Sequence, residues 1–292
     1  MKVGTRESKL AMRQTEIFCD RMARLNPDVE VEVVGMKSLG DIDLTSPLNA
    51  LSNTGAFVRE LDDAIKKGTI AASVNSLKDI PITMDDELMV VAIFERDSDE
   101  DVILPCSLED LPKGARVGTA SVRREHMLKE VRPDLEIVPL RGNIHTRLDK
   151  LDRGEYDAII LAKAGLDRMG IERPMFVLDK EQFIPAPAQG AIAVECRKDD
   201  TETRRILQKL DHMPTRTAVG VERSIMSLMG AGCSSPVGIN ATVQGDEILV
   251  RAVSYGYTPE PRRAEVVLPI DYVMDEVLGI AEYLTGKRDE II

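Results

Sequence analysis

The chain has 292 residues, more than a single hydrophobic core usually serves, so we expect two or three domains. Apolar residues make up 43% of it and charged residues 30%, as in water-soluble globular proteins, and no run nears the roughly 18 apolar residues that span a bilayer. The net charge of -12 argues against general binding of nucleic acid, and a chain without tryptophan lacks the usual platform for stacking bases.

The cysteines and histidines are too scattered to indicate a metal cluster or a disulfide framework. Cys19, Cys106, Cys196 and Cys233 include no Cys-x-x-Cys pair, so each is expected to be a free thiol. The first residues lead directly into a predicted strand and show no signal peptide. These features predict a cytoplasmic protein without a metal ion.

Residues 1–34 predict a strand, a helix and a second strand. Lys2-Val3-Gly4 begins the first strand, Ser8 is the candidate N-cap of a helix that runs to about Leu25, and 29–34 alternates as a strand does. A helix that follows a strand offers free backbone N–H groups and a positive dipole end to an anion, and Arg6 adds a positive charge beside them.

Residues 69–74 are β-branched or small and predict a short strand that is buried on both faces. Pro81 ends regular pairing and favours an extended conformation for the residue before it. Lys78 and Asp79 therefore fall at the carboxyl end of a central strand, where α/β sheets bind their ligands. On this stretch alone, a solvated charge pair at a strand end explains the residues equally well.

One sequence pattern occurs twice. Lys2-Val3-Gly4-Thr5 corresponds to Arg116-Val117-Gly118-Thr119, each followed by a predicted helix, a proline turn and a strand. Residues 67–74 correspond to 153–160, each a glycine helix cap before a buried strand. Two matches in the same order predict two similarly wound α/β lobes with a cleft between them, and chance similarity between strand–helix–strand units is the alternative.

Two connections between these lobes are expected. The first is a charged linker at 94–100, and the second is a return crossing at 184–190. The strand predicted at 191–195 would then rejoin the first lobe.

Residues 116–153 form a basic segment in an acidic protein, with seven arginines and two lysines against six acidic residues. Such a segment favours a small ligand with several negative charges. Arg123 and Arg124 fall in the first turn of the helix predicted from Val122 to about Val131, where a cation opposes the helix dipole unless an anion is bound. Their alternative role is surface solubility.

Other arginines follow predicted strands, namely Arg141, Arg147 and Arg168. Guanidinium groups bind carboxylates in two-pronged pairs. Several of them together predict a ligand that carries many carboxylates.

A third structural unit is predicted from Pro214 onward. A helix from Pro214 to Met229 is followed by strands at 237–243, 248–255 and 264–268 and by a helix at 271–284, which together predict a small α+β domain with an antiparallel sheet. Cys233 lies in the loop Gly230-Ala231-Gly232-Cys233, whose glycines allow close backbone approach and let the thiol project. An inert thiol in a turn is the alternative.

Together these motifs resemble the porphobilinogen deaminase family, also called hydroxymethylbilane synthase. The resemblance covers nearly the whole chain, and its motifs are long and ordered as in the family. They include Gly4-Thr5-Arg6-Glu7-Ser8-Lys9-Leu10-Ala11, Phe57-Val58-Arg59-Glu60-Leu61, Ser76-Leu77-Lys78-Asp79-Ile80-Pro81, Gly118-Thr119-Ala120-Ser121-Val122-Arg123-Arg124, Leu140-Arg141-Gly142-Asn143, Tyr156-Asp157-Ala158-Ile159-Ile160-Leu161-Ala162 and Gln189-Gly190-Ala191.

The resemblance implies an α/β fold with two periplasmic-binding-protein-like lobes and a third small α+β domain, which has a three-stranded antiparallel sheet. The expected bounds are 1–95 with 190–210 for the first lobe, 100–185 for the second lobe and 213–292 for the cofactor-attachment domain. Family enzymes are transferases that hold a dipyrromethane cofactor through a thioether to the loop cysteine, here Cys233. They condense four porphobilinogen molecules head to tail, with loss of ammonia, and release hydroxymethylbilane for tetrapyrrole and heme biosynthesis.

The resemblance also assigns roles to individual residues. Asp79 would be the catalytic residue, because a carboxylate beside the pyrrole N–H groups stabilises the cation formed when ammonia leaves. The cofactor would contact Ser8, Ser76, Lys78, Asp79, Thr119, Ser121, Arg123, Arg124, Arg141 and Gly142, with Cys233 as its covalent attachment. The substrate would contact Arg6, Arg147, Arg168 and Gln189.

Two positions depart from the family pattern. Thr54 stands where a lysine is usual and Asn75 where histidine is common, which puts in doubt how the 45–55 loop works but not the reaction class. A two-lobed anion-binding or sensor protein is the main alternative, and it would need neither Asp79 nor Cys233. A nucleic-acid regulator would need a basic helix that the chain lacks. Without heptads or a large apolar stripe, we expect a monomer whose partner is porphobilinogen, with no nucleic acid and no membrane.

Overall fold

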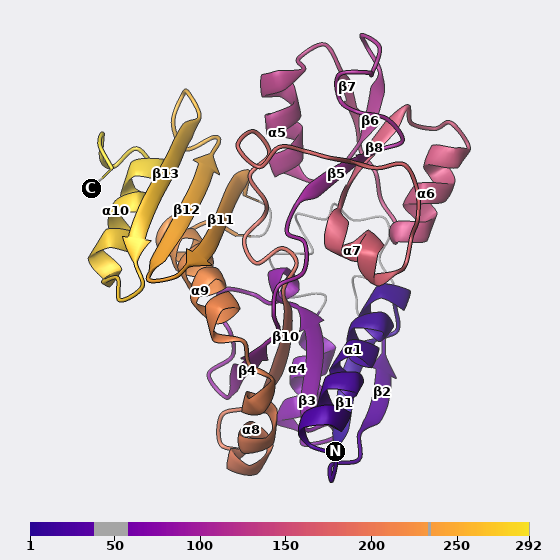
Figure 1. Cartoon of the computed structure of the whole chain (residues 1–292), viewed down its shortest axis with the longest axis vertical. Helices are drawn as coiled ribbons and strands as arrows, with labels where there is room; N and C mark the ends of the chain where they lie inside the picture. Colours follow the sequence, from indigo (N-terminus) through magenta and orange to yellow (C-terminus); the bar gives the residue numbers. More distant parts are fainter. Residues whose placement is uncertain (38–57, 233–234, 292) are drawn as a thin grey trace. The chain divides into compact units, whose positions relative to one another are not determined.

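The computed structural model describes residues 1–37, 58–232 and 235–291. The chain divides into two compact units (Figure 1). The first unit comprises Met1–Asp97 and Ala191–Arg216, and the second unit comprises Ser98–Gly190 and Thr217–Ile292. Within the described residues, no helix is both long and apolar enough to cross a membrane.

The first unit is built on a five-stranded sheet in the order β2-β1-β3-β10-β4. Its strands are β1 (Lys2–Arg6), β2 (Glu32–Met36), β3 (Ala72–Ser76), β4 (Leu88–Ile93) and β10 (Ile192–Arg197). β1 is parallel to both β2 and β3, whereas β10 is antiparallel to β3 and β4. The prediction that a strand after the return crossing rejoins the first lobe is therefore confirmed.

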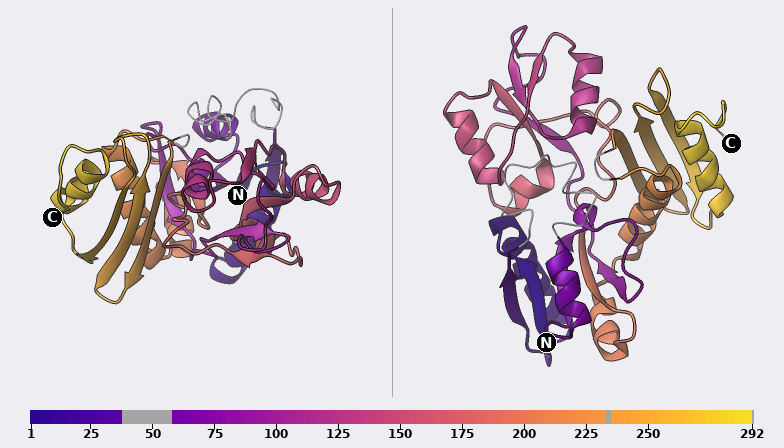
Figure 2. Two further views of the ribbon diagram at one scale, coloured as in Figure 1. Left: turned by 90° about the horizontal axis from the view of Figure 1, so that it is seen from above. Right: turned by 180° about the vertical axis from the view of Figure 1, so that it is seen from behind.

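Helices cover both faces of this sheet (Figures 1 and 2). Phe18 of α1 (Lys9–Leu25) packs with Val3 and Val74 on one face. On the other face, α4 (Arg59–Lys66) brings Leu61 over Gly4. Two further helical segments, α8 (Thr201–Leu207) and the 3-10 helix η2 (Gln208–Leu210), follow β10. Alternate residues of each strand thus enter different cores, as strand geometry requires.

The second unit contains a sheet of the same design, in the order β7-β6-β8-β5-β9. Its strands are β5 (Asp101–Leu104), β6 (Arg116–Gly118), β7 (Glu136–Val138), β8 (Ala158–Ala162) and β9 (Phe176–Val177). Its helices are α5 (Val122–Val131), α6 (Ile144–Asp152) and α7 (Lys163–Arg168). β6 is parallel to β7 and β8, and β5 is antiparallel to β8, as β10 is to β3 in the first unit.

The predicted internal repeat is confirmed down to single glycines. A Cβ on Gly4 would lie 2.5 Å from Ile70, and one on Gly118 would lie 2.7 Å from Tyr156, the residue that corresponds to Ile70 in the repeat. The two predicted helix caps, Gly68 and Gly154, have φ angles of 69° and 71°. Equivalent residues therefore have similar backbone conformations and packing in the two lobes.

The C-terminal part of the second unit is a three-stranded antiparallel sheet with two helices. Its elements are α9 (Met213–Leu228), β11 (Val237–Gln244), β12 (Glu247–Ser254), β13 (Arg262–Pro269) and α10 (Met274–Leu284), with α9 beginning in the first unit. The strands predicted at 237–243 and 248–255 form a hairpin, since Gln244 pairs with Glu247. α10 lies along one face of the sheet (Figure 2) and buries Val277 and Ile280. The predicted fold class is thus confirmed.

Three predicted elements begin three residues further along the chain than expected. The second strand begins at Glu32 rather than 29, because Val29 still donates to Asn26 in the preceding turn. The strand predicted at 69–74 occupies Ala72–Ser76. The last helix begins at Met274 because the Glu276 carboxylate accepts the Val273 N–H and so fixes its first turn there.

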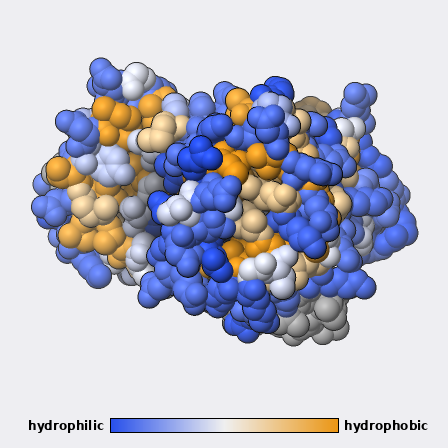
Figure 3. Space-filling view, turned by 90° about the horizontal axis from the view of Figure 1, so that it is seen from below, coloured by the Kyte–Doolittle hydropathy of each residue, from blue (hydrophilic) through white to orange (hydrophobic). Residues whose placement is uncertain are grey.

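The C-terminal sheet packs against the rest of the second unit through a shared apolar core. Val253 and Tyr255 lie in one cluster with Met127 and Ile184. On the face seen in Figure 3, hydrophilic side chains predominate and apolar side chains lie in separate patches. Exposed apolar residues of the C-terminal part include Val267 and Val273.

Candidate functional site

Several predicted site residues gather at the carboxyl edge of the sheet in the first unit. Arg6 ends β1 and Ser76 ends the neighbouring parallel strand β3. A short 3-10 helix, Leu77–Asp79, follows β3. Because Leu77 and Ile80 are both buried at 1% exposure, the intervening Lys78 and Asp79 remain partly exposed. The local sequence thus presents Asp79 at the sheet edge by burying its neighbours.

One hollow in the first unit brings these groups together. The Arg6 Nη1 lies 3.9 Å from the Asp79 Oδ2. The Ser8 hydroxyl accepts the Ala11 N–H and caps α1, as predicted. The residues that line the hollow are Arg6, Ser8, Leu10, Ala11, Gln14, Val58, Val74, Asn75, Ser76 and Asp79. It therefore combines a carboxylate, a guanidinium group, hydroxyls and a helix N-terminus within one concave surface.

Gln14 and Asn75 organise the wall behind this hollow. The Gln14 Nε2 donates to the Ser76 Oγ at 2.8 Å, which leaves the Ser76 proton to be donated elsewhere. Asn75 is 4% exposed and donates to the Ser73 Oγ and to the buried carboxylate of Glu195. The amide at position 75 thus supports the strand end from beneath rather than presenting a titrating group.

In the second unit, Arg123 and Arg124 converge on a single carboxylate. Their Nη2 atoms each donate to one oxygen of Asp101 at 2.7 Å, and all three side chains are almost fully buried. Burial alone would raise the pKa of Asp101, but the positive charges of both arginines outweigh it and hold that pKa well below its usual range. Burial excludes the alternative that these arginines serve surface solubility.

These two arginines keep donors beyond those that Asp101 uses. The Nε atoms of Arg123 and Arg124 are buried and, among the residues that the structure describes, have no hydrogen-bond partner. Buried donors of this kind are normally satisfied, so they fit an acceptor-rich ligand. The Ser121 hydroxyl caps the helix that carries both arginines, and the buried Thr119 accepts the Ser121 N–H.

Arg147 lies in a strongly positive environment. Burial first, and then the charges of Arg124 and Arg141, lower the pKa of Arg147 to about 10. Its Nε donates to the carbonyl of Gly142 at 2.7 Å. Like charges held this close favour an anionic ligand that would relieve their repulsion.

The remaining predicted residues also belong to the second unit. Gly142 has a φ of 113° and leaves no room for a Cβ beside Thr146. Arg168 donates to the carbonyl of Gly190 at 2.6 Å. Gln189 is 1% exposed and donates to the Asp101 Oδ1 at 2.9 Å. Gln189 therefore belongs to the same cluster as Arg123 and Arg124.

Two predicted features lie outside the described residues. One is the Cys233 thiol, and the other is the 45–55 loop with Thr54. The other three cysteines, Cys19, Cys106 and Cys196, are free thiols. No group of three or more potential metal ligands occurs within the part of the chain that the structure describes.

Sequence reasoning missed the residue that joins the arginine cluster. Asp101 opens β5, whose other residues Val102, Ile103 and Leu104 are apolar. An acidic residue at the start of an otherwise apolar strand was the available signal, because such a charge must be paired when it is buried. Gln14, a polar residue of α1 that is only 2% exposed, was also missed.

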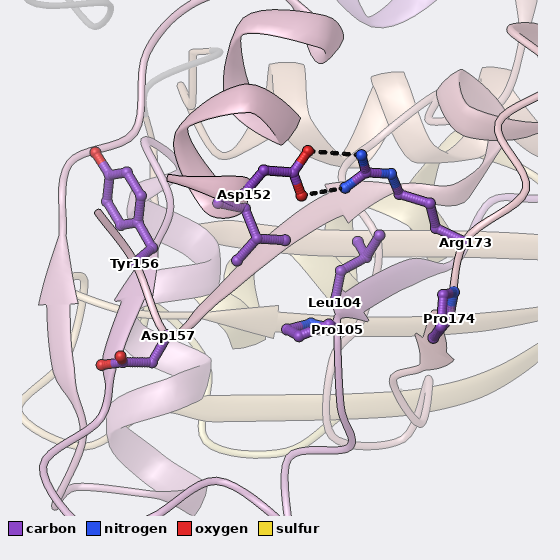
Figure 4. Close-up of a pocket in the computed structure, with 8 residues that line it drawn as sticks. Leu104, Pro105, Asp152, Tyr156, Asp157, Arg173 and Pro174 are labelled. Atoms are coloured by element: carbon purple, nitrogen blue, oxygen red, sulfur yellow. Dashed lines mark hydrogen bonds and ion pairs between the residues drawn. The ribbon is translucent and has the colours of Figure 1, made fainter. Parts of the chain in front are cut away.

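A second hollow, of about 300 Å³, lies in the second unit beside the carboxyl end of β5 (Figure 4). Leu104, Pro105 and Tyr156 line it beside a two-pronged ion pair between Asp152 and Arg173, with oxygen–nitrogen distances of 2.7 and 2.6 Å. Asp157, which also lines the hollow, pairs with Arg116, so the charges of these residues are balanced, unlike those of the arginine cluster.

The fold and these residues define an α/β protein with two similarly wound lobes, an Arg6–Asp79 hollow in one unit and a buried arginine cluster in the other. A sequence model of the family described as "Porphobilinogen deaminase, dipyromethane cofactor binding domain" matches residues 1–205. The chain belongs to the porphobilinogen deaminase family, an enzyme family of tetrapyrrole synthesis. The resemblance found in the motifs is confirmed.

Curated relatives and solved structures extend this comparison. A "Porphobilinogen deaminase" from Xanthomonas axonopodis pv. citri (strain 306) is 42% identical over 87% of this chain and 84% of its own length. One from Roseiflexus sp. (strain RS-1) is 42% identical over 86% and 84%. A periplasmic substrate-binding protein of an ABC transporter from Coxiella burnetii is 13% identical, with a TM-score of 0.42, over 76% of this chain and 96% of that one.

Proposed function

We propose that this chain condenses four porphobilinogen molecules head to tail, with loss of ammonia, onto a dipyrromethane primer and releases hydroxymethylbilane. The primer would be bound through a thioether to Cys233. Family membership supports the reaction class. The observation that carries the proposal is the Asp79 carboxylate at the carboxyl edge of β3, in a hollow that it shares with Arg6.

Asp79 is suited to the charge that develops when ammonia leaves. Once the aminomethyl nitrogen of porphobilinogen has taken up a proton, its bond to carbon breaks and the nitrogen leaves with the bonding electrons. The positive charge that remains on the substrate spreads to the pyrrole nitrogen. A partly exposed carboxylate can stabilise that charge and accept a proton from the ring, while Arg6 keeps the carboxylate in place at 3.9 Å.

The arginine cluster fits a ligand that carries several carboxylates. The buried Nε donors of Arg123 and Arg124 and the repulsion that lowers the pKa of Arg147 both favour added acceptor oxygens. Thr119, Ser121, Arg141, Gly142, Arg168 and Gln189 would complete the carboxylate contacts from the second unit, and Ser8, Ser76 and Lys78 would do so from the first. When bound, the dipyrromethane would supply the pyrrole carbon to which substrate units are added.

The proposal extends to the organisation of the chain. The first lobe (1–95 and 190–210) would contribute Asp79, the second lobe (100–185) the arginines, and residues 213–292 the attachment cysteine. We also propose that the protein acts as a monomer in the cytoplasm, where free thiols such as Cys106 persist.

Intact-protein mass spectrometry combined with turnover tests this function. The purified protein should weigh more than its 32.3 kDa sequence by one dipyrromethane. That increment should disappear in Cys233→Ser and remain in the control Cys106→Ser. Asp79→Asn should keep the increment yet turn over porphobilinogen about 10²-fold more slowly or worse. An active protein without the added mass, or wild-type turnover in Asp79→Asn, would contradict the proposal.

A further inference from the structure

The return crossing, residues 184–190, contains a residue in a rarely adopted backbone conformation. Ala188 has a φ of 61° and is 1% exposed. A residue with a Cβ rarely adopts this left-handed region, and it persists where the surrounding contacts enforce it. The position lies directly before Gln189, which belongs to the arginine cluster.

A turn within the crossing, closed by the Gln189 N–H bond to the Ala186 carbonyl at 3.0 Å, and a fully buried carboxylate together hold this conformation. Glu222 of α9 has no exposed surface, and its Oε2 accepts the Ala188 N–H at 2.7 Å. Its Oε1 accepts the N–H of Ala241, in β11, also at 2.7 Å. Hydrogen bonds from backbone N–H groups to a carboxylate are charge-assisted and strong. One side chain therefore joins the return crossing to the C-terminal sheet.

From Ala188 the contacts continue to the arginines. The Gln189 Nε2 donates to the Asp99 carbonyl at 2.7 Å and to the Asp101 Oδ1 at 2.9 Å. The same Asp101 oxygen accepts from Arg124, and the other accepts from Arg123. The direction in which Gln189 leaves the backbone thus determines how Asp101 is held between its cations.

Two further hydrogen bonds join β11 to the return crossing and to Asp99. The Asn240 Nδ2, beside Ala241 in β11, donates to the Asp99 Oδ2 at 2.7 Å. The Ile239 N–H donates to the carbonyl of Pro185 in the return crossing. β11 therefore bonds directly to the return crossing at Ile239 and to Asp99 at Asn240, and the Glu222 carboxylate adds a bridge from Ala241 to Ala188.

We propose that Glu222 is a positioning residue for the arginine cluster. By accepting the Ala188 and Ala241 N–H groups together, it fixes Gln189, and through Gln189 it sets Asp101 and the two arginines that Asp101 orients. The inference depends on the proposed function in one respect, since it takes carboxylates of the dipyrromethane or its growing chain as what those arginines bind.

Glu222→Gln tests this role with little change in shape. Its amide has only one acceptor oxygen and turns an NH2 group toward one of the two N–H donors. We expect porphobilinogen turnover to fall about tenfold or more, since small displacements of binding groups are costly. Gln189→Ala should have a similar effect. The turnover rate of the double variant should lie within about twofold of that of the slower single variant, because both changes act through one chain of contacts.

Two control variants separate positioning from stability. Ile280→Val removes a methyl group from the core under α10 and should lower the melting temperature while turnover per folded molecule stays at the wild-type value. Glu265→Gln changes an exposed carboxylate that pairs with Arg251 on the same sheet and should leave turnover unchanged. If the losses of Glu222→Gln and Gln189→Ala multiply, or if Ile280→Val loses turnover in proportion to its stability, the positioning role is overturned.

Hydrogen exchange gives a readout that does not need activity. In Glu222→Gln, exchange should accelerate in peptides that cover 186–190 and 237–243 and stay unchanged in α6. Unchanged exchange at 186–190 would overturn the proposed link. A wild-type protein without turnover would instead refute the proposed function, and the exchange result would still decide the link.

Discussion

Asp101 pairs with two arginines at once, so its loss should affect both. Arg123 and Arg124 are almost fully buried, and burial lowers the pKa of Arg123 even though Asp101 counteracts it. Removing one partner of a buried ion pair leaves an uncompensated charge, whereas exposed pairs contribute little. The cluster is therefore a sensitive point of the second unit.

Asp101→Asn should destabilise the protein by about 3–5 kcal/mol in chemical denaturation near neutral pH. Asp152→Asn is the matched control, because both oxygens of Asp152 also accept from guanidinium nitrogens, here those of Arg173 alone and at the surface, and its effect should be much smaller. Equal losses in the two variants would show that burial does not amplify the Asp101 contact.

The same pair of variants predicts a pH dependence. Since the folded state lowers the pKa of Asp101, this carboxyl contributes stability at any pH above its unfolded pKa of about 3.9. That contribution is lost as the pH falls toward the still lower folded value. The stability gap between wild type and Asp101→Asn should stay constant from pH 8 to about pH 5 and close only in stronger acid. A gap that closed near pH 6 would contradict this assignment.

Arg147 should behave in the opposite way. Burial and neighbouring cations oppose the charge of Arg147. Removing that charge relieves the unfavourable interactions and offsets the lost hydrogen bond to the Gly142 carbonyl. Arg147→Gln should therefore change the free energy of unfolding by less than about 1 kcal/mol while turnover falls about tenfold or more. Arg153→Gln, at an exposed pair with Glu155, is the control and should change neither quantity. A large loss of stability with normal turnover would make Arg147 structural.

At the scale of elements, the first strand of each lobe depends on a glycine. Gly4 in β1 and Gly118 in β6 leave space that the side chains of Ile70 and Tyr156 fill. A Cβ at either glycine would collide with those side chains. Each of these side chains packs directly on its glycine. The glycine therefore determines how closely the segment before β3 packs on β1, and the segment before β8 on β6.

Gly118→Ala should destabilise the second unit by about 1–3 kcal/mol, since the rigid ring of Tyr156 lies 2.7 Å from the new Cβ. Gly220→Ala is the control within α9, where a Cβ would meet nothing within 4 Å. It should stabilise the protein by about 0.5–1 kcal/mol through helix propensity. Thermal and urea denaturation of both variants measure the contrast, which fails if the two changes have the same sign.

At the scale of the whole molecule, the C-terminal sheet and the second lobe form one compact unit. Gly238 of β11 marks how tightly they join, since its Cβ would lie 2.5 Å from the backbone oxygen of Ile184. Tyr255 adds a hydrogen bond to Glu130 of α5, whose carboxylate also pairs with Arg263. Burial first, and then this bond, raise the pKa of Tyr255 well above its usual value, so the phenol stays protonated as a donor.

Gly238→Ala should cost about 1–3 kcal/mol or more, because the conflicting atom belongs to the backbone and cannot rotate away. Thr242→Ala, at an exposed position of the same strand, should have a much smaller effect. Calorimetry with limited proteolysis should show the sheet of 237–269 becoming cleavable before the rest of the second unit. A single unshifted transition would contradict the close packing inferred at Gly238.

Much of this architecture was predictable because it depends on neighbouring residues in the chain. Ser8 was recognisable as an N-cap, and the helix from Val122 to Val131 begins and ends as its pattern predicts. Ser76 and Asp79 reach the sheet edge because Leu77 and Ile80 must be buried. The strand predicted at 29–34 was displaced because local patterns do not fix where pairing starts.

The sequence by itself determined the two matching lobes, the C-terminal hairpin and the family, since each is encoded in periodicity, glycines and ordered motifs. Only the tertiary structure decided which charges meet. Asp101, Arg123, Gln189 and Glu222 are far apart in the chain, and no local pattern specifies that their donors and acceptors will be buried together. A buried charge is stable only where long-range folding supplies its partner, and that partner is set by topology rather than by neighbouring residues.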